Sequence, residues 1–499
     1  MNLKYTTTRT DTDQVTSSQA ILKGLGKDGG LYLPLSIPKT SIEEIGSFTD
    51  LTYNEKAMSI LGKFLTDFTE AELRHCIDNA YNDRTFTSSL ITPLHLLNDT
   101  SAVLELYHGP TSAFKDVALQ ILPYLLTTSA NKNGDNRTYV ILVATSGDTG
   151  KAALEGFKDV PNTKILVFYP NDGVSMVQKL QMVTQLGDNV KVVAVEGNFD
   201  DTQNGVKELF SKESLNSLLN DKNYTFSSAN SINWGRLVPQ IVYYFESYAQ
   251  LVNMKKIKLG DEINFTVPTG NFGNILAGYY AKEMGLPIKR LICAANANDV
   301  LKDFINTGTY DRNRDFVKTL SPSMDILISS NLERLLYLLS DGDKSLITGL
   351  MSDLKSEGSY KVSDQLLSKL QSIFFSDSAD DNDTIDTIRE MYEDKGYLID
   401  THTAVAYRVY EKFVAKTNDT SFNVIVSTAS PYKFNGAVAE AILPNYKDLD
   451  DMEQLKAINK ITGVSIPDGL NGLDGKDIRF SDVIIKDDME VTLKEYLNL

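Results

Sequence analysis

Near-continuous apolar segments alternate with helical patterns through the middle of the chain. The apolar segments have the length and the β-branched content of strands buried on both faces: RTYVILVA (137–144), TKILVFYP (163–170), VKVVAVEG (190–197), EINFTVP (262–268), IKRLICAAN (288–296) and FNVIVSTAS (422–430). Between them lie helical candidates such as GKAALEGFK, RLVPQIVYYFESYAQLV and NILAGYYAKEMG. This order predicts parallel βαβ units and therefore an α/β fold.

The regions outside this alternation suggest where the domains divide. The N-terminal segment before Pro93 has mostly helix and turn patterns. We therefore expect an N-terminal domain over residues 1–95, a smaller α/β domain over 96–240 and a larger α/β domain over 241–499. The acidic segment SDSADDNDTID (376–386) is poor in apolar residues and predicts a solvated loop.

Composition narrows the possible functions. The 499 residues carry a formal net charge of −17, with no concentrated basic patch, which argues against nucleic acid or anionic membranes as partners. The two cysteines cannot form a disulfide framework, and four histidines without CxxC or HExxH spacing argue against a metal site. The N-terminus lacks the apolar core of a signal peptide, and no apolar run has the length of a membrane span. We expect a cytoplasmic protein.

Lys115 lies at an unusual position in HGPTSAFKDVALQ. A Gly-Pro turn precedes it, and the helical pattern VALQILPYLL follows it, with Pro123 a kink or a break. The partial positive charge of a helix N-terminus and the neighbouring apolar side chains both favour a neutral amine, which could form a Schiff base. The alternative is a solvated lysine beside a helix cap.

Two further turns join a predicted strand to a predicted helix. GNFGN would let the backbone approach one phosphate monoester closely, and it comprises Gly270, Asn271, Phe272, Gly273 and Asn274. ATSGDTG offers hydroxyls and N–H groups to a small anion such as an amino-acid carboxylate, through Thr145, Ser146 and Thr149. Neither turn has the spacing of a dinucleotide or Walker motif, and each alone is equally compatible with a plain tight turn.

An amine and two anion-ready turns together indicate pyridoxal phosphate chemistry. HGPTSAFKD, TSGDTG, NSINWGR, GNFGN and DGGLYLP also resemble the threonine synthase family, in its longer bacterial and fungal branch. That family belongs to the tryptophan-synthase-β-like (fold type II) enzymes. The resemblance runs from KYTTTR near the start to STASPYKF, which ends near residue 434. It implies two open, mostly parallel sheets flanked by helices, plus a mainly helical N-terminal domain.

The resemblance also implies roles for individual residues. Lys115 would hold pyridoxal phosphate as a Schiff base and then act as acid and base, and Gly270 to Asn274 would cradle the cofactor's phosphate. The Thr428 hydroxyl would face the pyridine nitrogen, and Asp148 falls where relatives often carry an asparagine near the phenolic oxygen. The substrate's own phosphate would be received by residues of SANSINWGR, with Thr145 and Thr149 as further contacts: Asn230, Ser231 and Arg236. No chemistry is assigned to His402 or to SSNLER (329–334).

The reaction that the resemblance implies is conversion of O-phospho-L-homoserine and water to L-threonine and phosphate, by a monomer or a homodimer. Alternatives on the same scaffold are a threonine dehydratase, a cysteine-synthase-like enzyme and a noncatalytic binding protein. The cationic pocket around Arg236 argues against the first two, and the presence of Lys115 argues against the third. An ATP-dependent kinase is disfavoured because the chain lacks a Walker loop.

Overall fold

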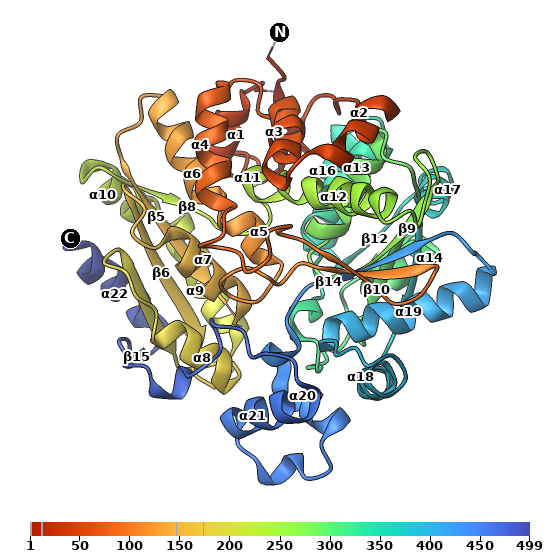
Figure 1. Cartoon of the computed structure of the whole chain (residues 1–499). Coiled ribbons are helices and arrows are strands. Elements are labelled where there is room, and N and C mark those ends of the chain that lie inside the picture. The colour runs from red at the N-terminus through yellow and green to blue at the C-terminus, as the bar shows by residue number, and fades with distance from the viewer. Residues whose placement is uncertain (1, 11–12, 146, 173) are drawn as a thin grey trace.

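Two open sheets flanked by helices form most of the molecule (Figure 1). The computed structural model describes residues 2–10, 13–145, 147–172 and 174–499. It confirms the predicted α/β class, because all six apolar segments form parallel strands. In the part of the chain so described, no helix is both long and apolar enough to cross a membrane.

The smaller sheet has the order β15-β7-β6-β5-β8, and its strands are all parallel. The strands are β5 (Thr138–Ala144), β6 (Thr163–Pro170), β7 (Val190–Val195), β8 (Tyr224–Ser227) and β15 (Val483–Ile484). The associated helices are α5 (Lys115–Leu119), α6 (Leu122–Lys132), α7 (Asp148–Phe157), α8 (Met176–Val183), α9 (Phe199–Ser211), α10 (Glu213–Asp221) and α22 (Met489–Leu497). Val140 and Leu142 pack against α9, α10 and α22, whereas Ile141 and Val143 face the main core. Both faces are therefore buried, which explains the continuous apolar sequence of the strands.

The larger sheet has the order β13-β10-β9-β14-β4-β3, and only β3 runs antiparallel to its neighbour. The strands are β3 (Leu94–Leu96), β4 (Ser101–Glu105), β9 (Ile263–Pro268), β10 (Ile288–Ala295), β13 (Phe374–Ser378) and β14 (Asn423–Ser427). The chain from residue 234 to 462 adds a two-stranded antiparallel sheet of β11 (Thr309–Asp311) and β12 (Ser359–Lys361). It also contains the helices α11 (Trp234–Leu237), α12 (Gln240–Asn253), α13 (Gly273–Met284), α14 (Val300–Thr307), α15 (Leu332–Leu339), α16 (Lys344–Ser356), α17 (Asp364–Ile373), α18 (Asp381–Lys395), α19 (Thr401–Thr417), α20 (Asn435–Ile442) and α21 (Asp451–Thr462). Helix α19 covers one face of this sheet, and the main core, which includes α12 and α13, covers the other.

The N-terminal region packs onto both halves of the molecule (Figure 1). It contains a two-stranded antiparallel sheet of β1 (Tyr5–Thr7) and β2 (Tyr32–Pro34), and the helices α1 (Ser17–Lys23), α2 (Ile42–Ser47), α3 (Tyr53–Phe64) and α4 (Glu70–Ala80). The indole of Trp234 lies between Tyr5, Phe64 and Tyr280, with ring centroids 5.3–5.7 Å apart. This aromatic cluster anchors the NSINWGR segment. The domain boundaries at residues 95 and 240 stay a prediction.

The prediction of a solvated loop over residues 376–386 is wrong. Its first residues belong to β13, which pairs with β10 at the sheet edge, and its remainder begins α18. The Asp380 side chain accepts a hydrogen bond from the backbone N–H of Asp383, so it caps the helix. Two more aspartates in the first turn are favourable there because a helix N-terminus carries partial positive charge. The acidic run is therefore a helix start.

Candidate active site

Four loops that follow strands of the two sheets carry the predicted site residues. Lys115 lies beyond β4, Asp148 follows β5, Gly270 follows β9 and Thr428 follows β14. In open parallel sheets, ligands bind beyond the carboxyl ends of strands. Figure 1 shows α5, which begins at Lys115, between the two sheets. Lys115 Nζ lies 3.4 Å from Asp148 Oδ2, so residues carried by both sheets meet at this amine.

Lys115 is a buried amine, with 8% of the residue exposed. Its Nζ lies 5.3 Å from the centroid of the Phe114 ring and 3.4 Å from the Ser323 hydroxyl oxygen. Burial lowers the pKa of Lys115, the contact with Asp148 opposes this shift, and the charges of Lys433 and Arg236 lower the pKa further. The alternative of a solvated lysine therefore does not describe this side chain.

Asp116, which follows Lys115 in the sequence, holds the turn that precedes Lys115. The Asp116 carboxylate accepts hydrogen bonds from the Thr111 backbone N–H at 2.8 Å and from the Thr111 hydroxyl at 2.7 Å. Gly109 is required there, because an added Cβ would lie 2.4 Å from the Cβ of Asp116. The backbone N–H of Phe114 donates to the Thr428 carbonyl at 2.8 Å, which joins the lysine loop to the end of β14. These contacts fix the start of α5.

Asp148 lies between two lysines. Its Oδ1 is 2.9 Å from Lys433 Nζ and accepts a hydrogen bond from Gln178 Nε2 at 3.0 Å, while its Oδ2 faces Lys115. Burial alone would raise the pKa of Asp148, but the two neighbouring lysines, Lys433 first and then Lys115, hold it well below the usual range. Asp148 is therefore an ionised carboxylate.

The GNFGN turn has the features of an anion cradle. Phe272 adopts the left-handed conformation (φ 64°) immediately before α13, whose first N–H groups have no acceptor within the helix. Asn274 Oδ1 accepts hydrogen bonds from the hydroxyls of Tyr243 and Tyr244, which leaves its buried Nδ2 without an acceptor among the described residues. A Cβ on Gly270 would lie only 3.0 Å from the Ser323 carbonyl oxygen. An unsatisfied donor beside a tight loop fits a bound phosphate.

Arg236 is a second buried cation with few partners. It lies in the short helix α11, is 5% exposed, and donates from Nη1 to the Ala229 carbonyl at 2.6 Å. Burial lowers the pKa of Arg236 to about 10. Within the residues that the structure describes, no carboxylate pairs with it. A buried guanidinium without a counter-charge indicates a site for an external anion.

The other predicted substrate contacts are distributed around the same loops. Ser231 Oγ accepts a hydrogen bond from Asn331 Nδ2 at 3.1 Å, and the same amide donates to the Asn271 carbonyl at 3.0 Å, which ties NSINWGR to the cradle. Asn230 is exposed beside Ser231. The Thr145 hydroxyl accepts from the N–H groups of Gly147 and Gly150, at 3.0 and 2.9 Å, and so shapes its own turn. Thr149 is half-buried, and Ser146 lies outside the described residues.

Sequence reasoning missed Ser323 and Lys433 and gave His402 no chemistry. Ser323 lies in the 3₁₀ helix η2 (Pro322–Met324), and its backbone N–H donates to His402 Nε2 at 3.1 Å. The other ring nitrogen of His402 is 2.9 Å from Asp400 Oδ1, so the imidazole connects Asp400 to the backbone of η2. Neither SPSMD nor PYKF has a composition that would single out these residues. Only the fold brings them to Lys115.

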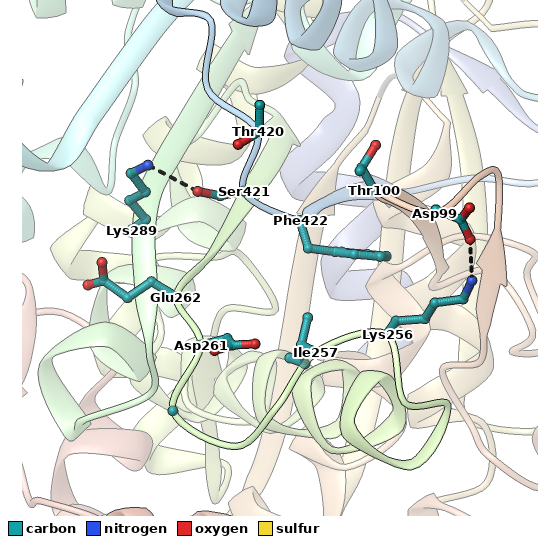
Figure 2. Close-up of a pocket in the computed structure, with 11 residues that line it drawn as sticks. Asp99, Thr100, Lys256, Ile257, Asp261, Glu262, Lys289, Thr420, Ser421 and Phe422 are labelled. Atoms are coloured by element: carbon teal, nitrogen blue, oxygen red, sulfur yellow. Dashed lines mark hydrogen bonds and ion pairs between the residues drawn. The ribbon is translucent and has the colours of Figure 1, made fainter.

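A surface groove of about 580 Å³ lies elsewhere on the molecule (Figure 2). It is formed at the amino ends of β4, β9, β10 and β14, whereas the loops described above follow the carboxyl ends of the strands. Its lysines already have acidic partners, since Lys256 lies 2.7 Å from Asp99 and Lys289 lies 2.9 Å from Asp419. The groove therefore offers no unpaired cation comparable to Arg236.

Comparison with known proteins agrees with this geometry. The family model described as "Pyridoxal-phosphate dependent enzyme" matches residues 90–428. The chain therefore belongs to the family of pyridoxal-phosphate-dependent enzymes, and the orphaned donor of Asn274 and the buried amine of Lys115 fit that cofactor. Two further models, "Threonine synthase N terminus" and "Threonine synthase, C-terminal", match residues 4–81 and 403–491. The chain belongs to the threonine synthase family.

Individual relatives support this assignment. The chain is 40% identical over 440 residues to threonine synthase of Pseudomonas aeruginosa, covering 88% of this chain and 90% of that protein. The crystal structure of pyridoxal-phosphate-bound threonine synthase from Brucella melitensis superimposes with a TM-score of 0.88 at 37% identity, covering 100% and 99% of the two chains. Human threonine synthase-like 1 is 41% identical over 435 residues, covering 85% of this chain. The chain spans 58% of the length of that relative.

Proposed function

We propose that the chain converts O-phospho-L-homoserine and water to L-threonine and phosphate. The observation that carries the proposal is the presence of two anion sites on different segments of the loops around Lys115. One is the cradle that begins at Gly270, and the other surrounds Arg236, whose guanidinium has no carboxylate partner among the described residues. A reaction that joins a phosphorylated cofactor to a phosphorylated substrate needs two such sites. A dehydratase or a β-replacement enzyme acting on an unphosphorylated amino acid needs only one.

Each group in the site has a role in this reaction. The cradle from Gly270 to Asn274 would hold the cofactor's phosphate, and the Thr428 hydroxyl would be the partner of its ring nitrogen. Asn230, Ser231 and Arg236 hold the substrate's phosphate, and the TSGDTG turn receives the rest of the amino acid through Thr145, Ser146 and Thr149. When bound, pyridoxal phosphate supplies a conjugated electron sink that stabilises negative charge on the substrate carbons.

Lys115 is the base that moves protons. Its Nζ removes the proton from Cα and then a proton from Cβ. Phosphate then leaves from Cγ while it is bound to Arg236. A proton from Lys115 is then returned to Cγ, which becomes the methyl group. Water adds its hydroxyl at Cβ, and a proton returns to Cα before threonine is released. The neutral Thr428 hydroxyl does not enforce protonation of the ring, which tempers the electron sink and suits elimination followed by replacement.

The test is an assay of the purified holoenzyme on O-phospho-L-homoserine that measures threonine and phosphate together. We expect equimolar formation of both products. Formation of an oxo acid and ammonia from threonine, without threonine formation from phosphohomoserine, would instead support a dehydratase. Absence of both reactions, in a protein that holds its cofactor on Lys115, would support a noncatalytic binding protein.

We also propose that the enzyme acts in the cytoplasm as a monomer or a homodimer. Both cysteines, Cys76 and Cys293, are buried free thiols, which is compatible with a reducing compartment. Light scattering on the purified holoenzyme decides the oligomeric state, and a mass above two chains would contradict the proposal.

A further inference from the structure

Lys433 is a second buried lysine beside the predicted cofactor-binding amine. It lies in the 3₁₀ helix η3 (Pro431–Phe434), and its side chain is 0% exposed. Its Nζ lies 2.9 Å from Asp148 Oδ1, donates to the Thr111 carbonyl at 2.9 Å, and donates to Gln181 Oε1 at 3.3 Å. Three acceptors are therefore available for its three N–H groups, and the ammonium is held in one place.

The two oxygens of Asp148 are divided between the two lysines. Oδ1 receives Lys433 and Gln178, whereas Oδ2 faces Lys115 and the Ser323 hydroxyl, both at 3.4 Å. The contact with Lys433 is the shorter of the two ion pairs. Without Lys433, the buried carboxylate would have Lys115 as its nearest cation, and it would favour the protonated form of that amine.

Among the described residues, the other charged groups around Lys115 and Lys433 do not pair with Asp148. Lys151 of α7 pairs with Glu155 at 2.9 Å, and Asp116 of α5 is bonded to Thr111. Helices α8 and η2 contribute neutral side chains, Gln178, Gln181 and Ser323, and α19 contributes His402, which contacts the backbone of η2. Arg236 of α11 is a second cation whose charge lowers the pKa of Lys115. Lys433 is thus the group that directly neutralises Asp148.

We propose that Lys433 is a positioning residue that neutralises Asp148, so that Lys115 is kept as an unprotonated amine. An ammonium has no lone pair for bonding to the aldehyde carbon of pyridoxal phosphate, a step that releases the carbonyl oxygen as water, and it cannot accept a proton from the substrate. The inference rests on the proposed role of Lys115 and adds a device that sets its protonation state. A lysine that only filled space or braced the loop would have no such effect.

The experiment measures how apo-protein captures pyridoxal phosphate as a function of pH, with borohydride trapping and peptide mapping. In Lys433→Met the pH midpoint of capture should move upward by about one to two pH units, because Asp148 is left unbalanced beside Lys115. Lys433→Arg keeps the charge and should keep the midpoint near that of the wild type. Asp148→Asn should move the midpoint in the opposite direction, because Lys115 then faces Lys433 without the carboxylate. The double variant Asp148→Asn/Lys433→Met should return close to the wild type.

The outcomes separate this inference from the proposed function. Trapping on Lys115 with an unchanged midpoint in Lys433→Met would overturn the inference and leave the function intact. Trapping on a different lysine would overturn the role of Lys115 itself. Should Lys433→Met fail to fold, the midpoint of Asp148→Asn is compared with that of the double variant, since these two proteins differ only at residue 433. Equal midpoints in that pair would overturn the inference as well.

Discussion

Replacing Arg236 with alanine removes the buried guanidinium that we assign to the substrate's phosphate. Among the residues that the structure describes, this side chain makes one hydrogen bond to protein, from Nη1 to the Ala229 carbonyl at 2.6 Å. The remaining N–H groups are available for phosphate oxygens, and burial makes each charge-assisted contact stronger than it would be in water. The cofactor's phosphate is assigned to the separate turn from Gly270 to Asn274.

The size of the effect follows from the burial. Removing one partner of a buried charge pair typically costs roughly 2 to 5 kcal/mol, which is about 30-fold to several thousand-fold in affinity or rate. We expect Arg236→Ala to lower kcat/KM for phosphohomoserine by at least about thirty-fold. Inorganic phosphate should also become a poorer competitive inhibitor. Arg236→Lys keeps the charge without the planar fork, so its kcat/KM should lie between those of the wild type and Arg236→Ala.

The assay combines steady-state kinetics, phosphate inhibition and the visible absorbance of the bound cofactor. Arg334→Ala is a matched control, because Arg334 is also buried but donates to three protein acceptors: the Tyr32 carbonyl, Asn331 Oδ1 and the Ile232 carbonyl. It should lower the midpoint of thermal unfolding, whereas Arg236→Ala should change that midpoint little. Wild-type kinetics in Arg236→Ala, or loss of cofactor with unchanged substrate affinity, would refute the assignment of NSINWGR to the substrate's phosphate.

Three further changes test other parts of the site. Lys115→Ala should abolish the borohydride-reducible cofactor linkage and nearly all turnover, which reduction and peptide mapping would show; a retained linkage would mean that another lysine holds the cofactor. Thr428→Asp should favour the protonated ring and slow turnover or alter product partitioning, and unchanged rates and products would show that Thr428 does not contact the ring nitrogen. Burial raises the pKa of Asp116 to about 6, against the Thr111 hydrogen bonds, so the folded state holds its proton more tightly than the unfolded state. This contribution to stability is present at low pH and is lost as pH rises toward about 6, a loss of roughly 3 kcal/mol. Asp116→Asn should remove this part of the pH dependence of the free energy of unfolding, measured in urea, and an unaltered pH dependence would contradict the assignment to Asp116.

The sequence contains the parts of the site that depend on local pattern. Strands such as β6 are apolar on both faces, and the turns after β5 and β9 carry their glycines at the strand-to-helix junction, so both features can be predicted without the fold. Helix α18 was missed because an acidic run looks solvated until its Asp380 cap is recognised. Ser323 and Lys433 were missed for a different reason. Each is far from Lys115 in sequence, and nothing in the local pattern shows that two 3₁₀ helices bring them within reach of Lys115 and Asp148.

The charge balance of the buried groups connects the fold to the reaction. Asp148 and Lys433 cancel one another at 2.9 Å, and Lys115 acts through its neutral form, so these three residues together present little net charge. Arg236 is then the uncompensated cation of the described site, and leaving such a charge buried is unfavourable unless an anion completes it. In the proposed reaction the substrate's phosphate would supply that anion, both while it is bound and as it leaves from Cγ. A site arranged in this way stabilises the leaving group while keeping Lys115 unprotonated, and both conditions are required by an elimination that begins with proton removal.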